Sequence, residues 1–467
     1  MNAVSLVHVT PPKTNPQLSC VIDFQDKAHP SESGKVIAYS ALNFSVEVNE
    51  DTHLSVGSQI TATFPIDGKE SIVHGFIKSK VDSQNGWILS IQQTQTPFAV
   101  RGVNDFRTSR RWKCNSKYQP TGVCESPIAL SSKLFFRALE VSKSGWTLVT
   151  SLRNEGIEPG QQLKTSMQLP TIGPFKLNLT VVHVRRREVD GEVQLVIGVK
   201  YKTKSKSFFA ALAQYLLQFN ADATAKALYK EGLKTRAISE AVTFKTVETQ
   251  QEYEEVLALR LYSYGQAQKI NATDPSKVIS KHDHWDNIFI AKHHGSVIAC
   301  VLLITPNENQ LLEIEEDLNC RIDDVIPKRE EVVEITKLCT HSEYRGGDLI
   351  AGLFREMGVF CLEKNRTTVI CGTDDKLAPL YLNCGFKETN YNYTIERYGN
   401  LQHRCLKGDV ITSVLGGKLV NPIIWSYLWR PCVEYFSKRN QNKLTFRQNM
   451  HLKIHRFFTP IIRRIKA

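Results

Sequence analysis

The spacing of hydrophobic and polar residues divides the chain into two kinds of sequence. From about residue 20 to 218, short apolar runs such as SIVHGFIKSKV and GWTLVTSL are separated by Gly, Pro and Asn, which predicts antiparallel strands. From Phe244 onward, strand-like runs alternate with stretches that have apolar residues at helical spacing. This alternation predicts an α/β domain about 160 residues long.

Two stretches of the β-rich half follow one plan. The order IAYSALNFSVEV, VGSQITATFP, HGFIKSKV and WILSIQ matches the order ALEVSKSGWTLV, PGQQLKTSMQLP, LTVVHVRRR and QLVIGVKY. Such a repeat predicts two small antiparallel β-barrels in tandem. Because Ser207 to Phe219 has helical spacing, we expect a helix to close or cover the second barrel.

The α/β half is expected to follow a helical linker rich in Ala and Lys and to precede a basic amphipathic helical extension. Its predicted order is helix EYEEVLALRLYSY, strands DNIFIAKHHG, SVIACVLLI and EVVEITKLCT, helix DLIAGLFREMGVFCLEK, strand TTVICGT, helix LAPLYLNC and one last strand. The predicted divisions are a first barrel over 1–100, a second over 101–220, the linker over 221–243, the α/β domain over 244–410 and the extension over 411–467.

Charge and cysteine usage narrow the class of protein. The formal charge of +12 favours an anionic partner, such as a nucleotide, an acidic carrier protein, a phospholipid surface or nucleic acid. The eleven cysteines form no C-x-x-C pair, which favours a reducing compartment over a disulfide framework or a zinc site. The scattered histidines lack a carboxylate ligand at helical spacing, so no metal site is predicted.

The sequence also bears on location. The first residues, MNAVSLVHVTPPKTNP, show no charged start followed by an apolar core, and no stretch offers about 18 uncharged apolar residues. We therefore expect a protein that is neither exported nor integral to a membrane. A cytoplasmic location is predicted, with peripheral contact at the inner membrane face as an alternative.

A two-part motif lies at the start of the second predicted barrel. The stretch FRTSRRWK places Arg107 and Arg111 as R-x-x-x-R, and Glu140, Ser142 and Gly145 follow about thirty residues later as E-x-S-x-x-G. This pattern resembles the signature of PilZ domains, R-x-x-x-R and then D/N-x-S-x-x-G. The resemblance implies a small barrel that binds cyclic di-GMP through these residues and Arg110.

The chemistry of these residue types suits a cyclic dinucleotide. Guanidinium groups pair bidentately with phosphate and with the guanine edge, and they also stack on bases. A carboxylate at Glu140 can accept from guanine N–H groups, although the family has Asp or Asn there, and Ser142 can bond phosphate. Gly145 would let backbone approach the ligand. The alternative is a solvated basic arm beside an ordinary strand and turn.

The first predicted barrel lacks the motif. Ala38, Ser40 and Asn43 stand at the corresponding positions, and no arginine pair precedes them. We expect this barrel to be a structural copy that binds no nucleotide.

Two motifs in the α/β half follow each other about 35 residues apart. The strand–loop–helix EVVEITKLCTHSEYRGGDLIAGLF contains Arg345, Gly346 and Gly347, and LAPLYLNCGF contains Tyr381 and Phe386. They resemble the R/Q-x-x-G-x-G/A donor loop and the Y-x-x-x-G-F element of GNAT acyltransferases. In such a loop, backbone N–H groups at a helix N-terminus hold the donor's phosphate.

A further set of polar residues resembles N-acyl amino acid synthases and LuxI-type acyl-homoserine lactone synthases, GNAT relatives that take acyl chains from acyl carrier protein. These families have an early arginine, then D-x-x-D, then E-x-S-R. The residues here in the same order are Arg260, Asp283, Asp286, Glu334, Thr336 and Lys337. The resemblance implies that every residue of this set except Glu334 binds the substrate. Asp283 could instead cap a turn, and Glu334 could be an ordinary paired carboxylate.

The proposed reaction is attack of an amine on a thioester, with a carboxylate removing the proton and strand N–H groups holding the oxyanion. Glu334 is the predicted base, and Tyr381 is the second predicted catalytic residue. Asp348 would oppose the pyrophosphate of coenzyme A more than the single phosphate of a pantetheine arm. The expected donor is therefore acyl carrier protein, with coenzyme A less favoured.

Alternatives stay open for the carboxyl-terminal segment and for the function of the whole chain. Trp425, Trp429, Phe457 and Phe458 accompany a basic segment that suits either an anionic lipid surface or a packed helical extension. For the whole chain, a cyclic-di-GMP-responsive N-acyltransferase competes with a signalling adaptor whose GNAT domain is inactive. Cyclic di-GMP and acyl carrier protein are the expected partners, and nucleic acid is not.

Overall fold

The computed structural model divides the chain into two compact units, Met1–Tyr215 and Leu216–Ala467. The residues it describes are 19–24, 31–39, 43–66, 69–93, 109–127, 131–203, 205–235, 237–268, 270, 275–326, 328–395, 400–410, 413, 424–439, 446, 450, 453–454 and 457. Arg107, Ser40 and Phe458 lie outside the described residues. Within the described part, no helix is long and apolar enough to cross a bilayer.

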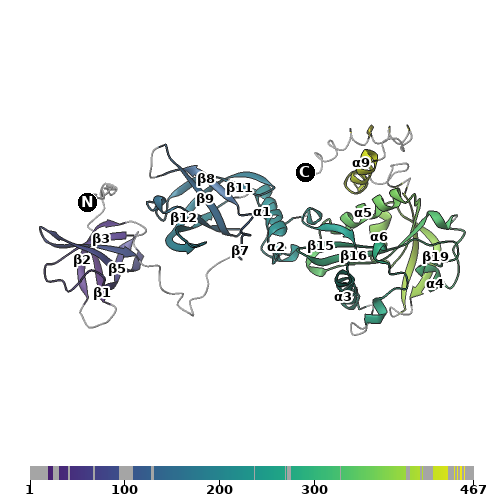
Figure 1. Cartoon of the computed structure of the whole chain (residues 1–467), viewed down its shortest axis with the longest axis horizontal. Helices are drawn as coiled ribbons and strands as arrows, with labels where there is room; N and C mark the ends of the chain where they lie inside the picture. The colour runs from purple at the N-terminus through teal and green to yellow at the C-terminus, as the bar shows by residue number, and fades with distance from the viewer. Residues whose placement is uncertain are drawn as a thin grey trace. The chain divides into compact units, whose positions relative to one another are not determined.

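Unit 1 begins with a closed six-stranded barrel in the order β1-β2-β3-β6-β5-β4 (Figure 1). The strands are β1 Ser19–Phe24, β2 Glu32–Tyr39, β3 Asn43–Val48, β4 Gln59–Ile66, β5 Lys69–Ser83 and β6 Gly86–Gln93. Alternate residues of these strands, such as Phe44, Val46 and Val48, are buried, because successive side chains of a strand point to opposite faces. The predicted first barrel is confirmed.

The second sheet of unit 1 has the order β10-β13-β12-β11-β8-β9-β7, and β10 also pairs with β9. The strands are β7 Trp112–Lys113, β8 Thr121–Glu125, β9 Lys133–Val141, β10 Gly145–Thr150, β11 Gln162–Leu169, β12 Gly173–Val189 and β13 Glu192–Tyr201. If β8 to β13 are matched with β1 to β6, each pairing of the first set has a counterpart in the second. The pairing therefore follows the repeat read from the sequence.

Helix α1, Lys206–Phe219, forms where helical spacing predicted it. Its Phe208 is buried and lies 6.3 Å from Trp146 and 5.6 Å from Tyr201, measured between ring centroids. The first half of α1 is therefore fixed to the second sheet by aromatic packing.

The linker is less helical than predicted. It contains the short helix α2, Ala225–Lys230, and a 3-10 turn over Ile238–Glu240, and a strand, β14, already begins at Thr243. Helix α2 stops early because Gly232 adopts a φ of 72°, a left-handed conformation that ends a helix.

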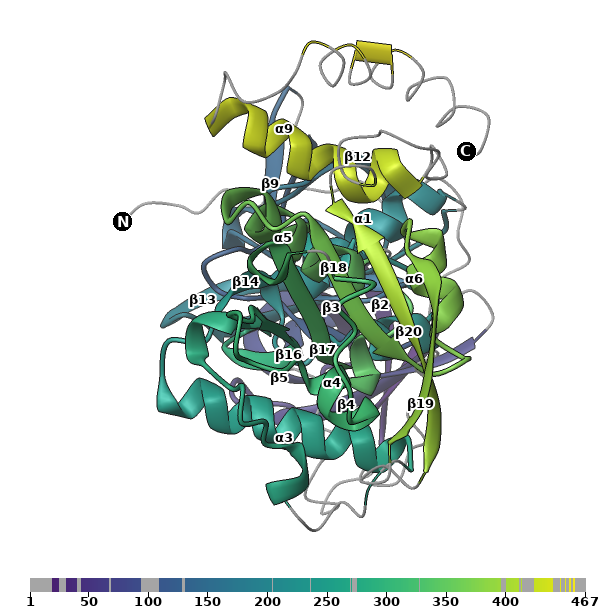
Figure 2. The same cartoon turned by 90° about the vertical axis from the view of Figure 1, so that its right-hand side faces the viewer.

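Unit 2 contains a seven-stranded sheet in the order β14-β15-β16-β17-β18-β20-β19. Its strands are β14 Thr243–Thr246, β15 Ile288–His293, β16 Ser296–Ile304, β17 Val332–Thr340, β18 Thr368–Thr373, β19 Lys387–Ile395 and β20 Leu401–Asp409. Its helices include α3 Gln250–Gln266, α4 Glu313–Leu318, α5 Leu349–Glu363 and α6 Ala378–Asn383. In Figure 2, α3 lies on one side of the sheet and α5 on the other.

Two features of unit 2 depart from the predicted order. The end of the domain has two strands, β19 and β20, where one was expected, and β20 inserts between β18 and β19. The sequence of β20, LQHRCLKGD, has few apolar residues, so its strand pattern was weak. Helix α4 was also missed, because EIEEDL is short and mostly acidic.

The carboxyl-terminal segment packs on unit 2 over the residues described. A π-helical turn, Trp425–Trp429, leads into α9, Arg430–Arg439. Trp425 and Trp429 are buried, and the Trp429 Nε1–H donates to the Cys384 carbonyl at 3.3 Å. Of the two alternatives, these two tryptophans follow the packed extension, since the protein interior covers them.

Candidate functional site

The turn between β9 and β10 is built around Ser142. The Ser142 hydroxyl donates to the Gly145 carbonyl at 2.6 Å and accepts from the Gly145 N–H at 3.1 Å. A Cβ added at Gly145 would lie 2.4 Å from the Val199 carbonyl oxygen, so a side chain there would displace β13. The glycine thus serves strand packing, and its approach to a ligand stays a prediction.

The arm that precedes β7 lies against this turn. The hydroxyls of Ser109 and Ser144 are 2.6 Å apart. Arg111 donates from Nη1 to Thr147 Oγ1 at 3.0 Å and to Glu140 Oε2 at 3.4 Å. The structure therefore brings Arg111, Glu140, Ser142 and Gly145 together.

The charges at this turn remain accessible to solvent. The Glu140 side chain is 42% exposed and that of Arg111 27%, so their ion pair is weak. Arg110 extends over the Trp112 ring, with Cζ 5.5 Å from the ring centroid. The Arg111 guanidinium, held loosely by Glu140, can exchange this carboxylate for a phosphate.

The glycine loop of unit 2 joins β17 to α5. Arg345, Gly346 and Gly347 are exposed, and Gly346 has a φ of 92° with open space where a Cβ would lie. The first N–H groups of α5 follow directly and lack carbonyl partners within the helix. The loop therefore has the form required to hold an anionic group at a helix N-terminus.

Strands β17 and β18 diverge beside this loop. They are the parallel pair of the sheet, and their pairing covers Val332–Ile335 and Thr368–Cys371. Strand β17 continues to Thr340 with a bulge, and Lys337 within it has a φ of 52°. Beyond Ile335, β17 continues to pair with β16, whereas its pairing with β18 ends at Ile335.

Glu334 lies on β17 and holds the start of α4. It is buried, and its two carboxylate oxygens accept from the N–H groups of Glu313 and Ile314 at 2.7 and 3.1 Å. Burial and the Glu313 carboxylate raise the pKa of Glu334 well above its usual value, against the effect of the two N–H groups. Glu334 is thus engaged structurally, and a carboxyl of raised pKa is also a stronger base.

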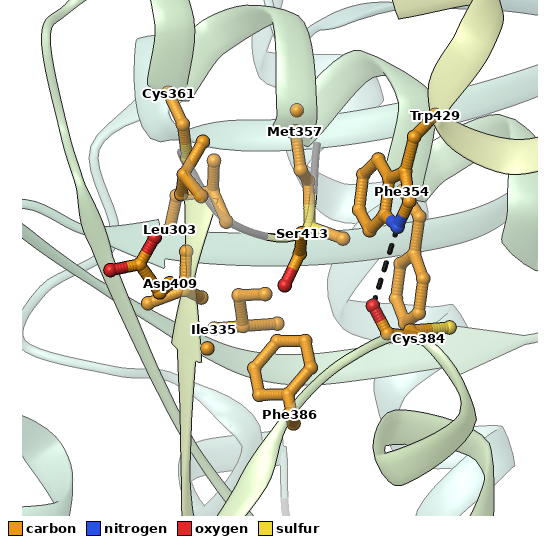
Figure 3. A pocket seen from close by; sticks show the side chains of 14 residues that line it. Leu303, Ile335, Phe354, Met357, Cys361, Cys384, Phe386, Asp409, Ser413 and Trp429 are labelled. Carbon is orange, nitrogen blue, oxygen red and sulfur yellow. Dashed lines mark hydrogen bonds between the residues drawn. The ribbon is translucent and has the colours of Figure 1, made fainter. Parts of the chain in front are cut away.

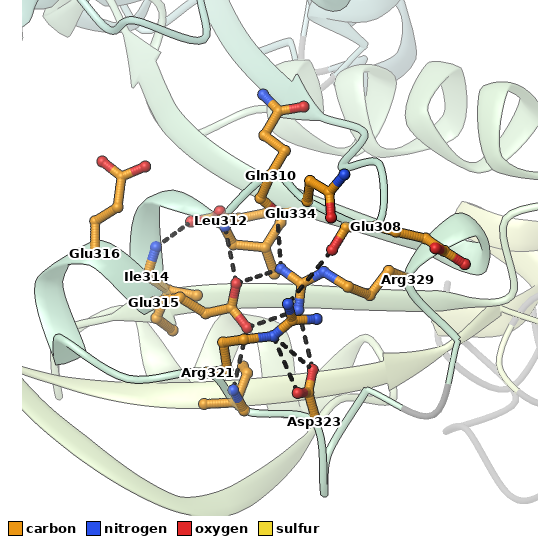
Figure 4. A network of polar contacts seen from close by, with 12 residues as sticks. Glu308, Gln310, Leu312, Ile314, Glu315, Glu316, Arg321, Asp323, Arg329 and Glu334 are labelled. Carbon is orange, nitrogen blue, oxygen red and sulfur yellow. Dashed lines mark hydrogen bonds and ion pairs between the residues drawn. The ribbon is translucent and has the colours of Figure 1, made fainter.

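The other residues of the E-x-T-K motif hold the same helix. Thr336 donates to Glu313 Oε2 at 2.9 Å, and the Lys337 ammonium lies 2.8 Å from Glu313 Oε1. Glu313, which the sequence reading missed, is thus the common partner of the motif. Farther along α4, Glu315 forms a buried ion pair with Arg329 (Figure 4).

Arg260 and Asp283 form a buried ion pair. The Arg260 side chain is fully buried, and its Nη1 lies 2.8 Å from Asp283 Oδ2 and 3.2 Å from the Val278 carbonyl. Tyr253 also donates to Asp283 at 3.1 Å. Asp286, by contrast, is exposed in a 3-10 turn. The structure thus joins Arg260 to Asp283 and leaves Asp286 apart from them.

Tyr381 lies on α6 within a cluster of aromatic rings. Its ring centroid is 5.7 Å from that of Phe354 and 5.5 Å from that of Phe386. Burial raises the pKa of Tyr381 well above its usual value, so the phenol stays protonated at neutral pH.

An apolar cavity of about 30 Å³ lies between α5, the sheet and the π-helical turn (Figure 3). Phe354, Met357, Cys361 and Trp429 contribute to its lining, together with Val369 near the start of β18. Because a volume of ~10–15 Å³ on this measure holds one water, a long acyl chain could enter this cavity only if the side chains that line it moved.

Comparison with known proteins agrees with the fold of unit 2. Residues 259–355 match the family model of the acetyltransferase (GNAT) domain. Unit 2 therefore contains a GNAT domain, the fold class of N-acyltransferases. No curated protein matches the chain.

Several solved structures resemble parts of the chain. The K. pneumonia MrkH–c-di-GMP complex is 14% identical and covers 43% of this chain and 86% of its own, with a TM-score of 0.22. FeeM, an N-acyl amino acid synthase from uncultured soil microbes, is 13% identical over 36% of this chain and 91% of its own, with a TM-score of 0.30. Escherichia coli YcgR in complex with c-di-GMP is 11% identical over 41% and 79%, with a TM-score of 0.19.

Proposed function

We propose that the chain is a cyclic-di-GMP-responsive N-acyltransferase that moves a long-chain acyl group from acyl carrier protein to an amine such as an amino acid. The observation that most strongly supports acyl transfer is the exposed glycine loop at the N-terminus of α5, beside strands that stop pairing after Ile335. A thioester arm whose phosphate binds this loop would extend along the free edge of β17.

The proposed chemistry needs a base and an acid. The amine nitrogen bonds to the thioester carbonyl carbon, and the C–S bond breaks. Glu334 takes the proton from nitrogen through water, and the protonated Tyr381 phenol returns a proton to the leaving thiolate. Main-chain N–H groups of β17 hold the developing oxyanion.

The choice of donor rests on charge. The formal charge of +12 favours an acidic carrier protein. The Asp348 carboxylate accepts from Ser239 N–H and Oγ–H at 2.7 and 2.5 Å, and Arg355 lies 3.9 Å away. Because these groups offset its charge, Asp348 opposes the pyrophosphate of coenzyme A less than the sequence indicated. Coenzyme A therefore stays in the proposal as the second donor.

The proposed nucleotide site is the turn between β9 and β10 with the arm before β7. Its support is the accessible Arg111–Glu140 pair beside the Ser142 turn. Cyclic di-GMP would replace Glu140 as the partner of the Arg111 guanidinium, because a phosphate accepts two parallel N–H bonds from a guanidinium.

The test of acyl transfer is lipid mass spectrometry of cells that overproduce the wild type, Glu334→Gln or Thr336→Val, with cyclic di-GMP raised and lowered. Thr336→Val loosens α4 without removing the carboxylate. We expect an N-acylated amine that disappears with Glu334→Gln and persists with Thr336→Val. If both variants lose the product equally, Glu334 acts only by holding α4, and if no strain makes a product, the chain is not this enzyme.

One observation favours a second candidate, a nucleotide-binding adaptor with an inactive GNAT domain. Glu334, Thr336 and Lys337 are all bonded to the start of α4, so the polar motif is used to hold the fold. An adaptor would yield no acyl product while still binding cyclic di-GMP.

A further inference from the structure

The linker between the second sheet and the GNAT domain contacts both ends of the glycine loop. The loop, 345–347, is preceded by Glu343 and Tyr344 and followed by Asp348. Each of these flanking residues is connected, directly or through one side chain, to the segment 216–240. The contacts all lie within unit 2.

The first contact passes through His293, a buried side chain at the end of β15. Its Nε2 lies 2.6 Å from the Leu217 carbonyl and its Nδ1 lies 2.9 Å from the Tyr344 hydroxyl. Because a carbonyl only accepts, Nε2 carries the proton, and Nδ1 accepts from the tyrosine. Burial lowers the pKa of His293, so the neutral ring keeps both bonds at neutral pH.

The second contact holds Glu343 from α2. Thr224, which also caps α2, donates to Glu343 Oε2 at 3.1 Å, and the Lys226 ammonium lies 2.8 Å from Oε1. The Lys226 side chain is 48% exposed, so this pair is adjustable and contributes little to the stability of the fold.

The third contact holds the other end of the loop. Ser239 donates its N–H and its hydroxyl to the two oxygens of Asp348, and Arg355 Nη2 donates to Ser239 Oγ at 2.9 Å. Asp348 is the residue from which α5 begins. The orientation of the first N–H groups of α5 is therefore fixed by a linker residue.

We propose that the segment 216–240, here called the clamp, sets the geometry of the glycine loop and thereby lets the nucleotide state of unit 1 control donor affinity. The clamp begins within α1, whose Phe208 contacts Tyr201, and Tyr201 donates to the Ser142 carbonyl at 2.7 Å. Helix α1, Lys206–Phe219, belongs to unit 1 up to Tyr215 and to unit 2 from Leu216 onward. The inference rests on the proposed function and adds that regulation acts on donor binding rather than on the chemical step.

The clamp is tested by calorimetry on the full-length chain with decanoyl-phosphopantetheine and decanoyl-coenzyme A as probes, with and without saturating cyclic di-GMP. The variants are Ser239→Ala and Lys226→Gln. The matched control is Lys281→Gln, which removes an exposed lysine of unit 2 that pairs with Glu316. Turnover with decanoyl-acyl carrier protein gives KM and kcat separately.

We expect each clamp variant to weaken donor binding threefold to tenfold, about the effect of one lost hydrogen bond. The response of donor affinity to cyclic di-GMP should also shrink, with kcat and the control unchanged. Unaltered donor affinity and nucleotide response in both variants would overturn the clamp even if turnover is normal. Donor binding without turnover in the wild type would contradict the proposed enzymatic activity. The comparison of donor binding between wild type and variants would still test whether the clamp controls donor affinity.

Discussion

The two groups of motif residues differ in what their charges are bound to. At the β9–β10 turn of unit 1, Arg111 and Glu140 form a partly exposed pair at 3.4 Å. In the GNAT unit, Arg260 and Asp283 are almost completely buried and lie 2.8 Å apart. A solvated pair can open for a ligand at small cost, whereas a buried pair is part of the fold. Similar motif matches in the sequence thus mark residues that are open to a ligand in unit 1 and residues that hold the fold together in unit 2.

The largest expected effect is on the buried pair. Arg260→Ala leaves Asp283 charged in the interior, so we expect the GNAT unit to lose about 3–5 kcal/mol of stability. Hydrogen exchange of α3 and β15 in the full-length chain measures the free energy of opening. The matched control is Arg404→Ala, which removes exposed ion pairs with Asp375 and Glu388 and should leave the stability of the unit almost unchanged. Equal losses for the two variants would contradict the comparison.

At the exposed pair the expected effect is on binding. Arg111→Ala should weaken cyclic di-GMP binding about tenfold to a hundredfold, the range for a lost hydrogen bond to a charged group, while the thermal midpoint changes little. Calorimetry with cyclic di-GMP measures the binding affinity. Arg153→Ala, an exposed arginine in the same unit, is the control and should bind as the wild type does. Unchanged binding by Arg111→Ala would remove the arm from the nucleotide site.

Acid should act on the buried charges of the GNAT unit. Glu252 is buried beside Lys292 and Lys245, at 2.7 and 3.0 Å. Burial raises its pKa, but these ammonium groups and the Glu248 N–H outweigh burial and lower the pKa to about 2. Because the pKa is lowered in the folded state, the ionised Glu252 stabilises the fold above about pH 4.5, and this stabilisation is lost as the pH falls toward 2. Allowing for solvent screening, we expect the ionised Glu252 to contribute about 2 kcal/mol to the free energy of unfolding.

The measurement is the thermal midpoint against pH for the wild type, Glu252→Gln and Glu388→Gln. Glu252→Gln should flatten the profile between pH 4.5 and 2, and Glu388→Gln, an exposed carboxylate, should follow the wild type. Parallel profiles for all three proteins would show that Glu252 has no special part in acid sensitivity.

The sequence predicted the elements better than the contacts. Strong alternation and apolar runs gave the first barrel, α1, α3 and most of the GNAT strands. Helix α4 was missed because its six residues, EIEEDL, carry four acidic side chains and no apolar stripe. Its position depends on Glu334, a partner 20 residues away in sequence, and no local pattern encodes such a pairing.

The same limit applies to the roles of site residues. The motif spacing brought Arg111, Glu140 and Ser142 together, since strand pairing places the end of β9 and its turn beside the arm that contains Arg111. The reason for Gly145 depends on Val199, on a strand more than fifty residues later. The contacts of Asp348 with Ser239 likewise join the loop to the linker, which composition alone describes as a spacer.

The smallest expected effect concerns the residue in which the nucleotide motif departs from its family pattern. Glu140 accepts from Thr147 at 2.9 Å and from Arg111 at 3.4 Å, so its carboxylate competes with a ligand phosphate for the guanidinium. Glu140→Asp withdraws the carboxylate by one methylene and frees Arg111, which should tighten cyclic di-GMP binding about twofold to fivefold, roughly 0.5–1 kcal/mol. Glu155→Asp shortens the acidic partner of Arg186 in the same unit and should leave binding unchanged. Weaker binding by Glu140→Asp would mean that Glu140 contacts the nucleotide itself, and the exposed pair would then be part of the ligand site rather than a competitor for it.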